Sequence, residues 1–450
     1  MRQYFVLGVT LLCMSLILAN IGLFHFTVIC MHPAGSNSTA HFSPSQEAWI
    51  FSTAAVGRLA GSWPTVFLMN KFGLRTTFTV FGMVTGIATL LMPLAAVSFY
   101  SSIAVRCLQG LAVASLFVAH GAVPLAWGRP DQQGLIVSFL SCCYEVSPIV
   151  TMAVAGFFCT STVGWPGVYY LFGSVTVLSF GSFFVLYTNS PFKKNNRIHC
   201  IESTAQVLHV DENTKQKRKK TQLIVPYKEI FTSPSVWGVW MTALGDGVGY
   251  QMFTMYGPIY INKVLHYEVA KTGLLAALPF ALAIGAKFFG GLILDKVNFV
   301  SRHTKILTFT SLAQAGMTVC FLVLTFLTAE QANIAQAVFT LTIVVSGLHC
   351  CGVFSASQVV AQHYNHIVTA VVAMENAVVS LALPLIVSVI APNHEASEWA
   401  QVFYCMIAAL VATNLVFVIC TKVRPAKWTG ITQQSIRKQK PDVEEECDRV

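Results

Sequence analysis

Long apolar stretches recur along the whole chain, separated by short segments that carry Lys and Arg residues. A helix of roughly 17–25 apolar residues crosses a bilayer, and twelve stretches reach that length. Lipid offers no water to backbone groups, so each stretch should be helical. The first is too long for the apolar region of a signal peptide. The predicted spans lie at about 4–31, 46–68, 77–97, 100–126, 132–158, 165–188, 234–262, 270–294, 304–328, 332–354, 366–391 and 397–421.

One long polar segment, 189–233, divides the twelve spans into six and six. It contains "KKNNR" and "KQKRKK" and is too polar to bury a core, so we expect a largely disordered linker. A short amphipathic part is expected near "VPYKEIF". The pattern predicts an all-α membrane protein with an N-terminal six-helix half (1–188), a basic linker (189–233), a C-terminal six-helix half (234–421) and a tail (422–450).

Composition supports a membrane protein and argues against other classes. Of the 450 residues 55% are hydrophobic and 10% are charged, whereas soluble domains carry about 25% charged residues. The net charge of +9 comes from short basic runs with no aromatic interleaving, which is not a nucleic-acid pattern. The thirteen cysteines show no C-x-x-C spacing. We therefore predict no metal and no cofactor, and we expect buried free thiols.

The basic residues also predict an orientation. With both termini in the cytosol, 22 of the 28 Lys and Arg residues fall on the cytosolic side and two on the other. This asymmetry follows the positive-inside rule. The sequon at Asn37 then falls on the non-cytosolic side, where N-glycosylation occurs.

Two short loops at equivalent places in the two halves resemble each other. They are "MNKFGLR" (69–75) and "LDKVNFVSR" (294–302), and parallel repeats of this kind are a known transporter architecture. Their pattern is similar to the signature loop of the major facilitator superfamily, written G-x-x-x-D-R/K-x-G-R/K. The resemblance implies that these loops gate conformational change. The matching residues are Asn70, Lys71, Arg75, Asp295 and Lys296.

Several further stretches together resemble one family of that superfamily, the anion:cation symporters, which include sialin, the vesicular glutamate transporters and sodium–phosphate cotransporter-like proteins. The resemblance runs from about residue 5 to 428 and implies two six-helix halves that transport an anion by alternating access. The stretches are "RCLQGL" (106–111), "GWPGVYYLFG" (164–173), "SPSVWG" (233–238), "GPIYINKVLHYEVAKTGLLAALP" (257–279) and "GGLILDK" (290–296).

The sequence departs from the family at charged positions. Arg106 is kept, but Val113 stands where the span-4 motif has glutamate. In span 1 Leu23 replaces an arginine and His25 an asparagine, and in span 7 Asp246 stands where glutamate carriers have arginine. Asn376 matches a family asparagine. The altered charges indicate that the substrate need not be a dicarboxylate.

Charged and polar side chains inside the spans are costly and mark cavities or partners. For the charged residues the alternative is a structural salt bridge or, for an arginine near an interface, snorkelling, and for Tyr250 it is aromatic packing. Lys287 is expected to reach the interface, and His120 and His349 are expected to be core histidines. The candidates for substrate binding or coupling are Arg106, Asp246, Glu145, His25, Arg58, Glu375, Asn376 and Tyr250.

The leading interpretation is a secondary active transporter of a small organic or inorganic anion, coupled to a proton or Na⁺ gradient or to membrane potential. No nucleotide-binding loop and no nucleophile constellation support an ATP-driven pump or an enzyme. Two alternatives stay open: a ligand sensor without flux, and a carrier of a neutral or cationic solute paired by Asp246. Whether it resides in the plasma membrane or in an intracellular vesicle or lysosome is left open.

Overall fold

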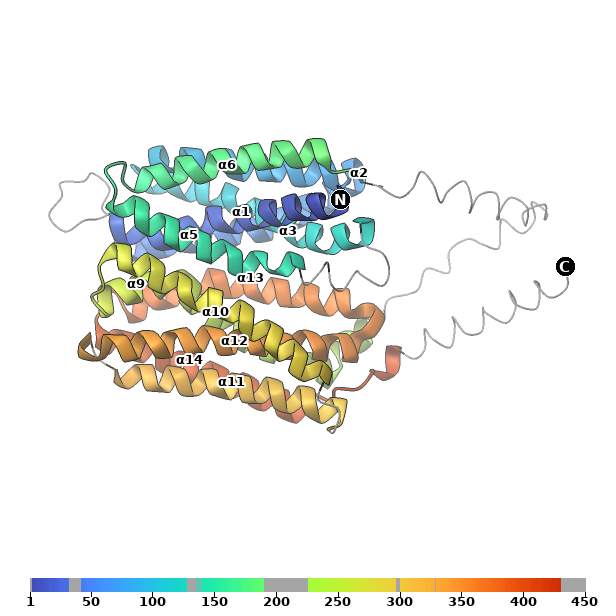
Figure 1. Ribbon diagram of the computed structural model, residues 1–450. Coiled ribbons are helices and arrows are strands. Elements are labelled where there is room, and N and C mark those ends of the chain that lie inside the picture. The colour runs from blue at the N-terminus through green and yellow to red at the C-terminus, as the bar shows by residue number, and fades with distance from the viewer. Residues whose placement is uncertain are drawn as a thin grey trace, which may run out of the picture.

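The computed structural model shows long helices running side by side in one bundle (Figure 1). It describes residues 2–31, 42–127, 136, 139–189, 226–296, 300–327 and 329–429. The helices form two groups in chain order. The N-terminal group consists of α1 (Arg2–Met31), α2 (Pro44–Ala95), α3 (Phe99–Trp127), α5 (Cys143–Thr160) and α6 (Trp165–Leu186).

The C-terminal group begins with a five-residue helix, which confirms the short amphipathic element expected near "VPYKEIF". Its Ile230 is buried while the neighbouring Lys228 and Glu229 are exposed. The elements are α8 (Tyr227–Phe231), α9 (Pro234–Ile259), the π-helix η2 (Tyr260–Val264), α10 (Val269–Lys296), α11 (Arg302–Phe326), the 3₁₀ turn η3 (Ala329–Gln331), α12 (Ala332–Ala361), the 3₁₀ turn η4 (Gln362–Tyr364), α13 (Asn365–Ile390) and α14 (Ala396–Cys420).

Ten helical segments in the described residues are long and apolar enough to cross a membrane. The other two predicted spans are also helical, in the first part of α2 and in α9 with η2. Tryptophan, tyrosine, glycine and Asp246 lower the hydropathy of α9. The loop expected between the second and third spans is shortened to a sharp break within α2 at Gly73, where φ is 78°. Glycine adopts that conformation without steric cost.

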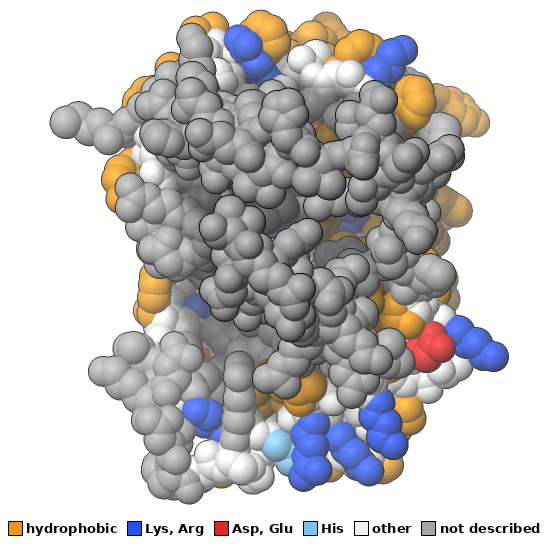
Figure 2. Space-filling model, turned by 90° about the vertical axis from the view of Figure 1, so that its right-hand side faces the viewer, with side chains coloured by type: hydrophobic (Ala, Val, Ile, Leu, Met, Phe, Trp, Pro, Cys, Tyr) orange, Lys and Arg blue, Asp and Glu red, His pale blue; other side chains and the backbone are white. Residues whose placement is uncertain are grey.

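The two ends of the bundle differ. The N-terminal end of α1 and the segment after α14 lie at the same end, at the right of Figure 1, which we call the proximal end; the opposite end is the distal end. Figure 2 looks onto the proximal end and shows Lys and Arg side chains around its rim. Basic residues of the described segments beside the proximal helix ends include Lys71, Arg75, Lys228, Lys305, Lys422, Arg424 and Lys427.

The two groups meet mainly along three helix pairs, α5 with α10, α2 with α13 and α1 with α9, and α1 also touches α10. One hydrophobic core cluster contains residues of both groups, among them Phe51 of α2 and Tyr256 of α9. The other clusters lie within single groups. These helix pairs therefore form most of the contact between the two groups.

Candidate functional site

A stack of aromatic rings joins the two groups toward the distal end. The ring of Phe51 on α2 stacks on His25 of α1 and on Tyr256 of α9, with a centroid separation of 5.3 Å in both cases. Tyr256 also meets Trp399 of α14 edge-on at 6.0 Å. Each of these rings is buried. The predicted candidate His25 thus lies in a buried ring contact that spans the two groups.

The distal ends of α5 and α10 cross in direct backbone contact. A Cβ added to Gly273 would lie 2.7 Å from the carbonyl oxygen of Met152 and 3.0 Å from Cα of Gly156. A side chain at Gly273 therefore cannot be accommodated without separating the helices. The crossing and the aromatic stack together close the distal side between the groups.

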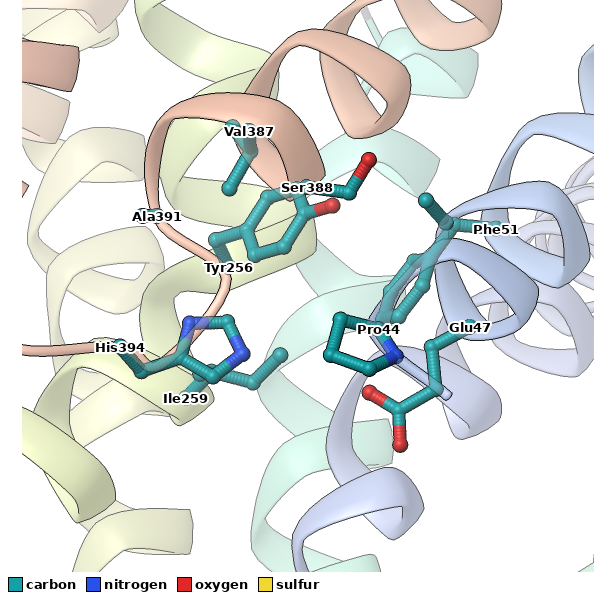
Figure 3. A pocket seen from close by; sticks show the side chains of 10 residues that line it. Pro44, Glu47, Phe51, Tyr256, Ile259, Val387, Ser388, Ala391 and His394 are labelled. Atoms are coloured by element: carbon teal, nitrogen blue, oxygen red, sulfur yellow. The ribbon is translucent and has the colours of Figure 1, made fainter. Parts of the chain in front are cut away.

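A shallow crevice outside the aromatic stack has one wall from each group (Figure 3). Pro44 and Glu47 lie at the start of α2, opposite His394 in the loop between α13 and α14. Burial lowers the pKa of His394, as does nearby Lys263, while Glu398 opposes that effect. The neutral imidazole is therefore the form favoured while the crevice is closed.

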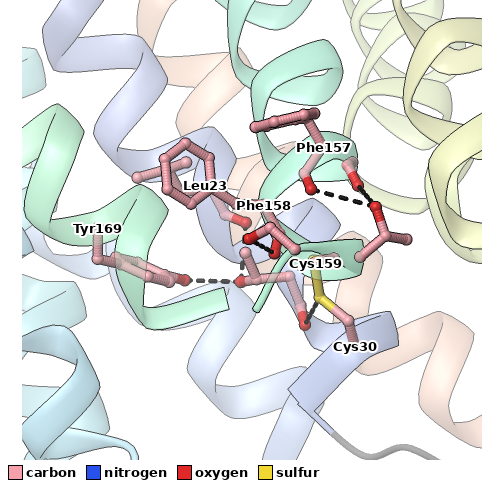
Figure 4. The surroundings of a disulfide bond; sticks show 10 residues. Leu23, Cys30, Phe157, Phe158, Cys159 and Tyr169 are labelled. Carbon is pink, nitrogen blue, oxygen red and sulfur yellow. Dashed lines mark hydrogen bonds between the residues drawn. A yellow bond between two sulfur atoms is a disulfide. The ribbon is translucent and has the colours of Figure 1, made fainter. Parts of the chain in front are cut away.

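A disulfide between Cys30 and Cys159 joins the distal ends of α1 and α5 (Figure 4). The expectation of free thiols is therefore wrong for these two cysteines, since α1 and α5 bring them together with Cα atoms 5.9 Å apart. Nearby, the hydroxyls of Thr27 and Tyr169 hydrogen-bond at 2.7 Å. The bond lies within the N-terminal group and makes its distal end more rigid.

Near the middle of the bundle an arginine bridges the two groups. Arg58 stands 14 residues into α2, roughly 21 Å along the helix axis. Its Nη2 donates to the carbonyl oxygen of Asn376 and to Oγ of Ser380 on α13, at 2.9 Å each. Gln251 of α9 donates to the same Asn376 carbonyl at 2.8 Å and accepts a hydrogen bond from Ser380.

No carboxylate lies within ion-pair distance of Arg58 among the described residues, and its Nε has no hydrogen-bond partner there. A guanidinium inside a membrane is costly unless it is partnered or faces a cavity. The hydrogen-bond partners of Arg58 within the described part of the chain are therefore all neutral. The structure brings two sequence candidates together here, Arg58 and Asn376.

An ion pair joins the groups closer to the proximal end. Glu145 of α5 pairs with Lys287 of α10, and the side chain of Glu145 is nearly buried. The expectation that Lys287 extends to the membrane interface is therefore wrong, because a buried carboxylate holds its ammonium. The hydroxyl of Tyr250 on α9 also donates to the carbonyl oxygen of Tyr144, at 3.2 Å.

Arg106 lies inside the N-terminal group, fully buried. Its Nε donates to the carbonyl oxygen of Ile50 on α2, and its Nη1 to that of Ile21 on α1. The same Nη1 donates to Gln109, while Phe24 lies 5.1 Å from the guanidinium carbon. In this conformation Arg106 ties three helices together and does not reach the contact between the groups. Its role as a substrate-binding cation stays a prediction.

Other parts of the "RCLQGL" motif also serve packing. Gln109 donates to Thr89 Oγ1 at 3.0 Å. A Cβ on Gly110 would lie 2.0 Å from the carbonyl oxygen of Ala54, so α2 and α3 approach closely only because this position is glycine. The motif therefore shapes the N-terminal group.

Asp246 lies inside the C-terminal group, with its side chain 18% exposed. Oδ1 accepts a hydrogen bond from Ser346 of α12 at 2.7 Å and lies 3.5 Å from Nδ1 of His349. His349 is buried, as expected, but its neighbour is a carboxylate.

Glu375 of α13 is partly exposed, and its buried Oε2 has no hydrogen-bond partner among the described residues.

The predicted gating loops are described in part. Lys71 is exposed, and Arg75 donates from Nε to the carbonyl oxygen of Phe184, which anchors the loop to α6. Nothing is described of the side chains of Asn70, Asp295 and Lys296, and Asn37 lies outside the described residues.

Sequence reasoning missed Gln251, Ser380 and the two bonded cysteines. The only signal for Gln251 is a lone amide within an apolar span, which is also typical of a residue that hydrogen-bonds within the core. Ser380 carries no signal, because serine in a membrane helix commonly bonds to its own backbone. Both acquire significance only when α2, α9 and α13 are placed together.

Comparison with known proteins matches residues 4–384 to the model of the Major Facilitator Superfamily. Sodium-dependent phosphate transport protein 1 of Mus musculus is 24% identical over 93% of this chain and 89% of its own length. Vesicular glutamate transporter 3 of Danio rerio is 24% identical over 90% of this chain and 70% of its own. The crystal structure of a D-xylose-proton symporter superposes with a TM-score of 0.70 at 14% identity, covering 93% of this chain and 98% of the symporter.

Proposed function

The chain belongs to the Major Facilitator Superfamily, and we propose from this premise that it carries a small anion across the membrane by alternating access, with Arg58 as the cation that receives the anion. The resemblance to anion:cation symporters is confirmed by the relatives, which include phosphate and glutamate transporters. An organic carboxylate, an amino acid or inorganic phosphate would each supply a negatively charged partner for the guanidinium of Arg58.

The observation that carries the proposal is the position of Arg58. Its guanidinium bridges α2 and α13, two helices of different groups, through neutral hydrogen-bond acceptors. An anion that bound there would replace these acceptors with a charge-assisted, bidentate contact. Because the groups must separate at Arg58 when they rock, anion binding and movement of the groups are linked at one residue.

The conformation fits one stage of such a cycle. The aromatic stack and the α5–α10 crossing close the distal side. Opening that side requires Phe51 and Tyr256 to part and Gly273 to move away from α5. The loops at Lys71, Arg75, Asp295 and Lys296 would then limit movement at the proximal side, as their counterparts in the superfamily do.

We propose that the proximal end faces the cytosol, together with both termini. The basic side chains at that end support this orientation by the positive-inside rule. The disulfide at the distal end also supports it, because disulfides persist in compartments outside the cytosol. The distal loop that contains Asn37 would then be accessible to glycosylation.

A second candidate is a neutral or cationic solute held by Asp246, which is favoured by the partial exposure of that carboxylate. In that case Asp246→Asn abolishes solute binding while Arg58→Gln spares it. A sensor that binds without flux is the third outcome of the same experiment. For an anion carrier the coupling ion is H⁺ or Na⁺.

The test is an uptake screen in proteoliposomes with labelled phosphate, glutamate and other carboxylates, under imposed pH, Na⁺ and voltage gradients. We expect uptake of at least one anion by the wild type and its loss in Arg58→Gln. Arg424→Gln, which removes an exposed arginine after α14, is the matched control and retains uptake. Anion uptake that Arg58→Gln leaves unchanged would refute the assignment.

A further inference from the structure

A chain of hydrogen bonds leads from α14 to His349, the neighbour of Asp246, through the C-terminal group. Gln314 of α11 donates from Nε2 to the carbonyl oxygen of Leu410 at 3.3 Å and to Thr413 Oγ1 at 2.8 Å. A backbone carbonyl only accepts hydrogen bonds, so the orientation of the Gln314 amide is fixed. Its Oε1 must therefore accept, and Thr242 Oγ1 donates to it at 2.6 Å.

This direction determines the tautomer of His349. The hydroxyl of Thr242 has one proton, which it gives to Gln314, so it accepts from Nε2 of His349 at 3.0 Å. A neutral imidazole carries one proton, which is then on Nε2, and Nδ1 is left with a lone pair. That nitrogen is buried, lacks a hydrogen-bond partner among the described residues and lies 3.5 Å from Asp246 Oδ1.

Two lone pairs therefore face each other between His349 and Asp246, and one proton is missing from an otherwise complete network. Without it the pair has a charge of −1, and with it the imidazolium and carboxylate have a charge of zero. The side chain of Asp246 is partly exposed, so water can reach the gap between the two atoms.

The charged and titratable groups near the pair come from several helices, among them Arg58 of α2, which donates to the Asn376 carbonyl beside Gly247. On α9 the nearest titratable side chain is Tyr250, one turn further along. From α10 the stem of Lys287 packs against α12 at Gly347, and its ammonium pairs with Glu145. From α13 the closest charge is Glu375. The described side chains that α11 and α14 contribute, Gln314 and Thr413, are uncharged. The side chains of Cys350 and Cys351 are not described.

The pair also lies next to Arg58 and its hydrogen-bond partner Asn376. A Cβ on Gly247 would lie 3.0 Å from Oδ1 of Asn376, so the residue after Asp246 packs directly on the residue that accepts from Arg58. A shift of α9 on protonation would therefore reach the proposed anion site through one contact. Gln251, on the same helix, hydrogen-bonds to Asn376 as well.

We propose that Asp246 and His349 form the proton-binding site of this carrier, in which one proton between Oδ1 and Nδ1 couples to movement of the anion. The proposal rests on the proposed transport function and names H⁺ as its coupling ion. The proton comes from water on one side, binds the pair without covalent change elsewhere and leaves to water on the other side.

Proton binding is measured without a substrate, by titrating the purified full-length protein in weakly buffered detergent with a pH-indicator dye. We expect Asp246→Asn and His349→Gln each to lose the same single step of about one proton, and the double variant to lose no more. His120→Gln, which removes a histidine that bonds to Ser141 in the N-terminal group, keeps the step. Two separate additive losses, or none, would overturn the proposal.

A second pair of variants covers the case in which removing a buried charge prevents folding. Thr242→Val removes the acceptor that holds the Nε2 proton, whereas Thr242→Ser retains it. We expect the titration step to shift in Thr242→Val and to stay at the wild-type pH in Thr242→Ser. Identical titration of both would overturn the proposal.

Flux distinguishes failure of this inference from failure of the transport function. In proteoliposomes, Asp246→Asn should lose anion accumulation driven by a pH gradient and retain exchange of labelled for unlabelled anion. Proton-driven accumulation that persists in this variant would overturn the proton site while leaving anion transport intact. A wild type with no flux of any anion would instead contradict the proposed function.

Discussion

The α5–α10 crossing makes a prediction about conformation that a single methyl group tests. In Gly273→Ala the new Cβ would lie 2.7 Å from the Met152 carbonyl oxygen, whereas non-bonded carbon contacts are optimal near about 3.5 Å. The helices must therefore separate by about 0.8 Å at this point, or the backbone must distort. Either response destabilises the conformation in which the distal side is closed.

Overpacking of this kind costs about 1–3 kcal/mol. Because about 1.4 kcal/mol corresponds to a tenfold change, the equilibrium should shift by roughly 5- to 150-fold toward conformations that are open at the distal side. Gly285→Ala is the control on the same helix, because a Cβ there meets no atom within 4 Å. It should leave the equilibrium unchanged.

The assay is the rate at which a membrane-impermeant maleimide labels a cysteine introduced at Ser388, which lines the distal crevice. We expect faster labelling when Ser388→Cys is combined with Gly273→Ala than when it is combined with Gly285→Ala or stands alone. The wild type, which lacks the introduced cysteine, gives the background rate. Equal rates in all three, with each variant folded and monodisperse, would show that the crossing does not close the distal side.

Three further predictions follow from single contacts. Arg106→Gln should lower the thermal stability of the purified protein by about 1.5–3 kcal/mol for each charged hydrogen bond lost, and a wild-type melting temperature would contradict the packing role. Cys30→Ser should expose one additional alkylatable thiol, at Cys159, and lower the melting temperature. If reduction of the wild type did not increase its number of alkylatable thiols, the disulfide would be excluded. Because burial and Lys263 lower the pKa of His394, its contribution to the closed crevice is present above its ordinary value of about 6.5 and is lost as pH falls through the lowered value. Acid lowers the thiolate fraction of every cysteine, so labelling is compared between variants at each pH. Lowering the distal pH should then slow labelling at the crevice less than it does in His394→Gln.

The positions of the helices could be predicted from the sequence because bilayer thickness sets the length of each apolar stretch. The roles of the buried charges could not. Arg58 and Arg106 both stand in apolar spans, and one bridges the two groups while the other is enclosed within one. The difference depends on how α2 and α3 are rotated about their axes, and lipid-facing and protein-facing sides are both apolar. An apolar pattern therefore carries little information about rotation.

The same limit applies to the polar networks and the disulfide. Asp246 was recognisable as an acid among glycines, but its partner His349 is about a hundred residues away and resembles any core histidine. Cys30 and Cys159 are separated by 129 residues, and scattered cysteines allow many pairings. These contacts depend on which helices neighbour each other, which the pattern of a single sequence does not specify.

Counterflow tests the central claim most directly. Proteoliposomes are loaded with an unlabelled anion from the panel and diluted into a trace of the same anion carrying a label. Alternating access at Arg58 predicts that the wild type transiently accumulates label above its outside concentration, that Arg424→Gln does the same and that Arg58→Gln does not. Label that never exceeds the level in protein-free liposomes, for any anion of the panel, would contradict anion transport by this protein.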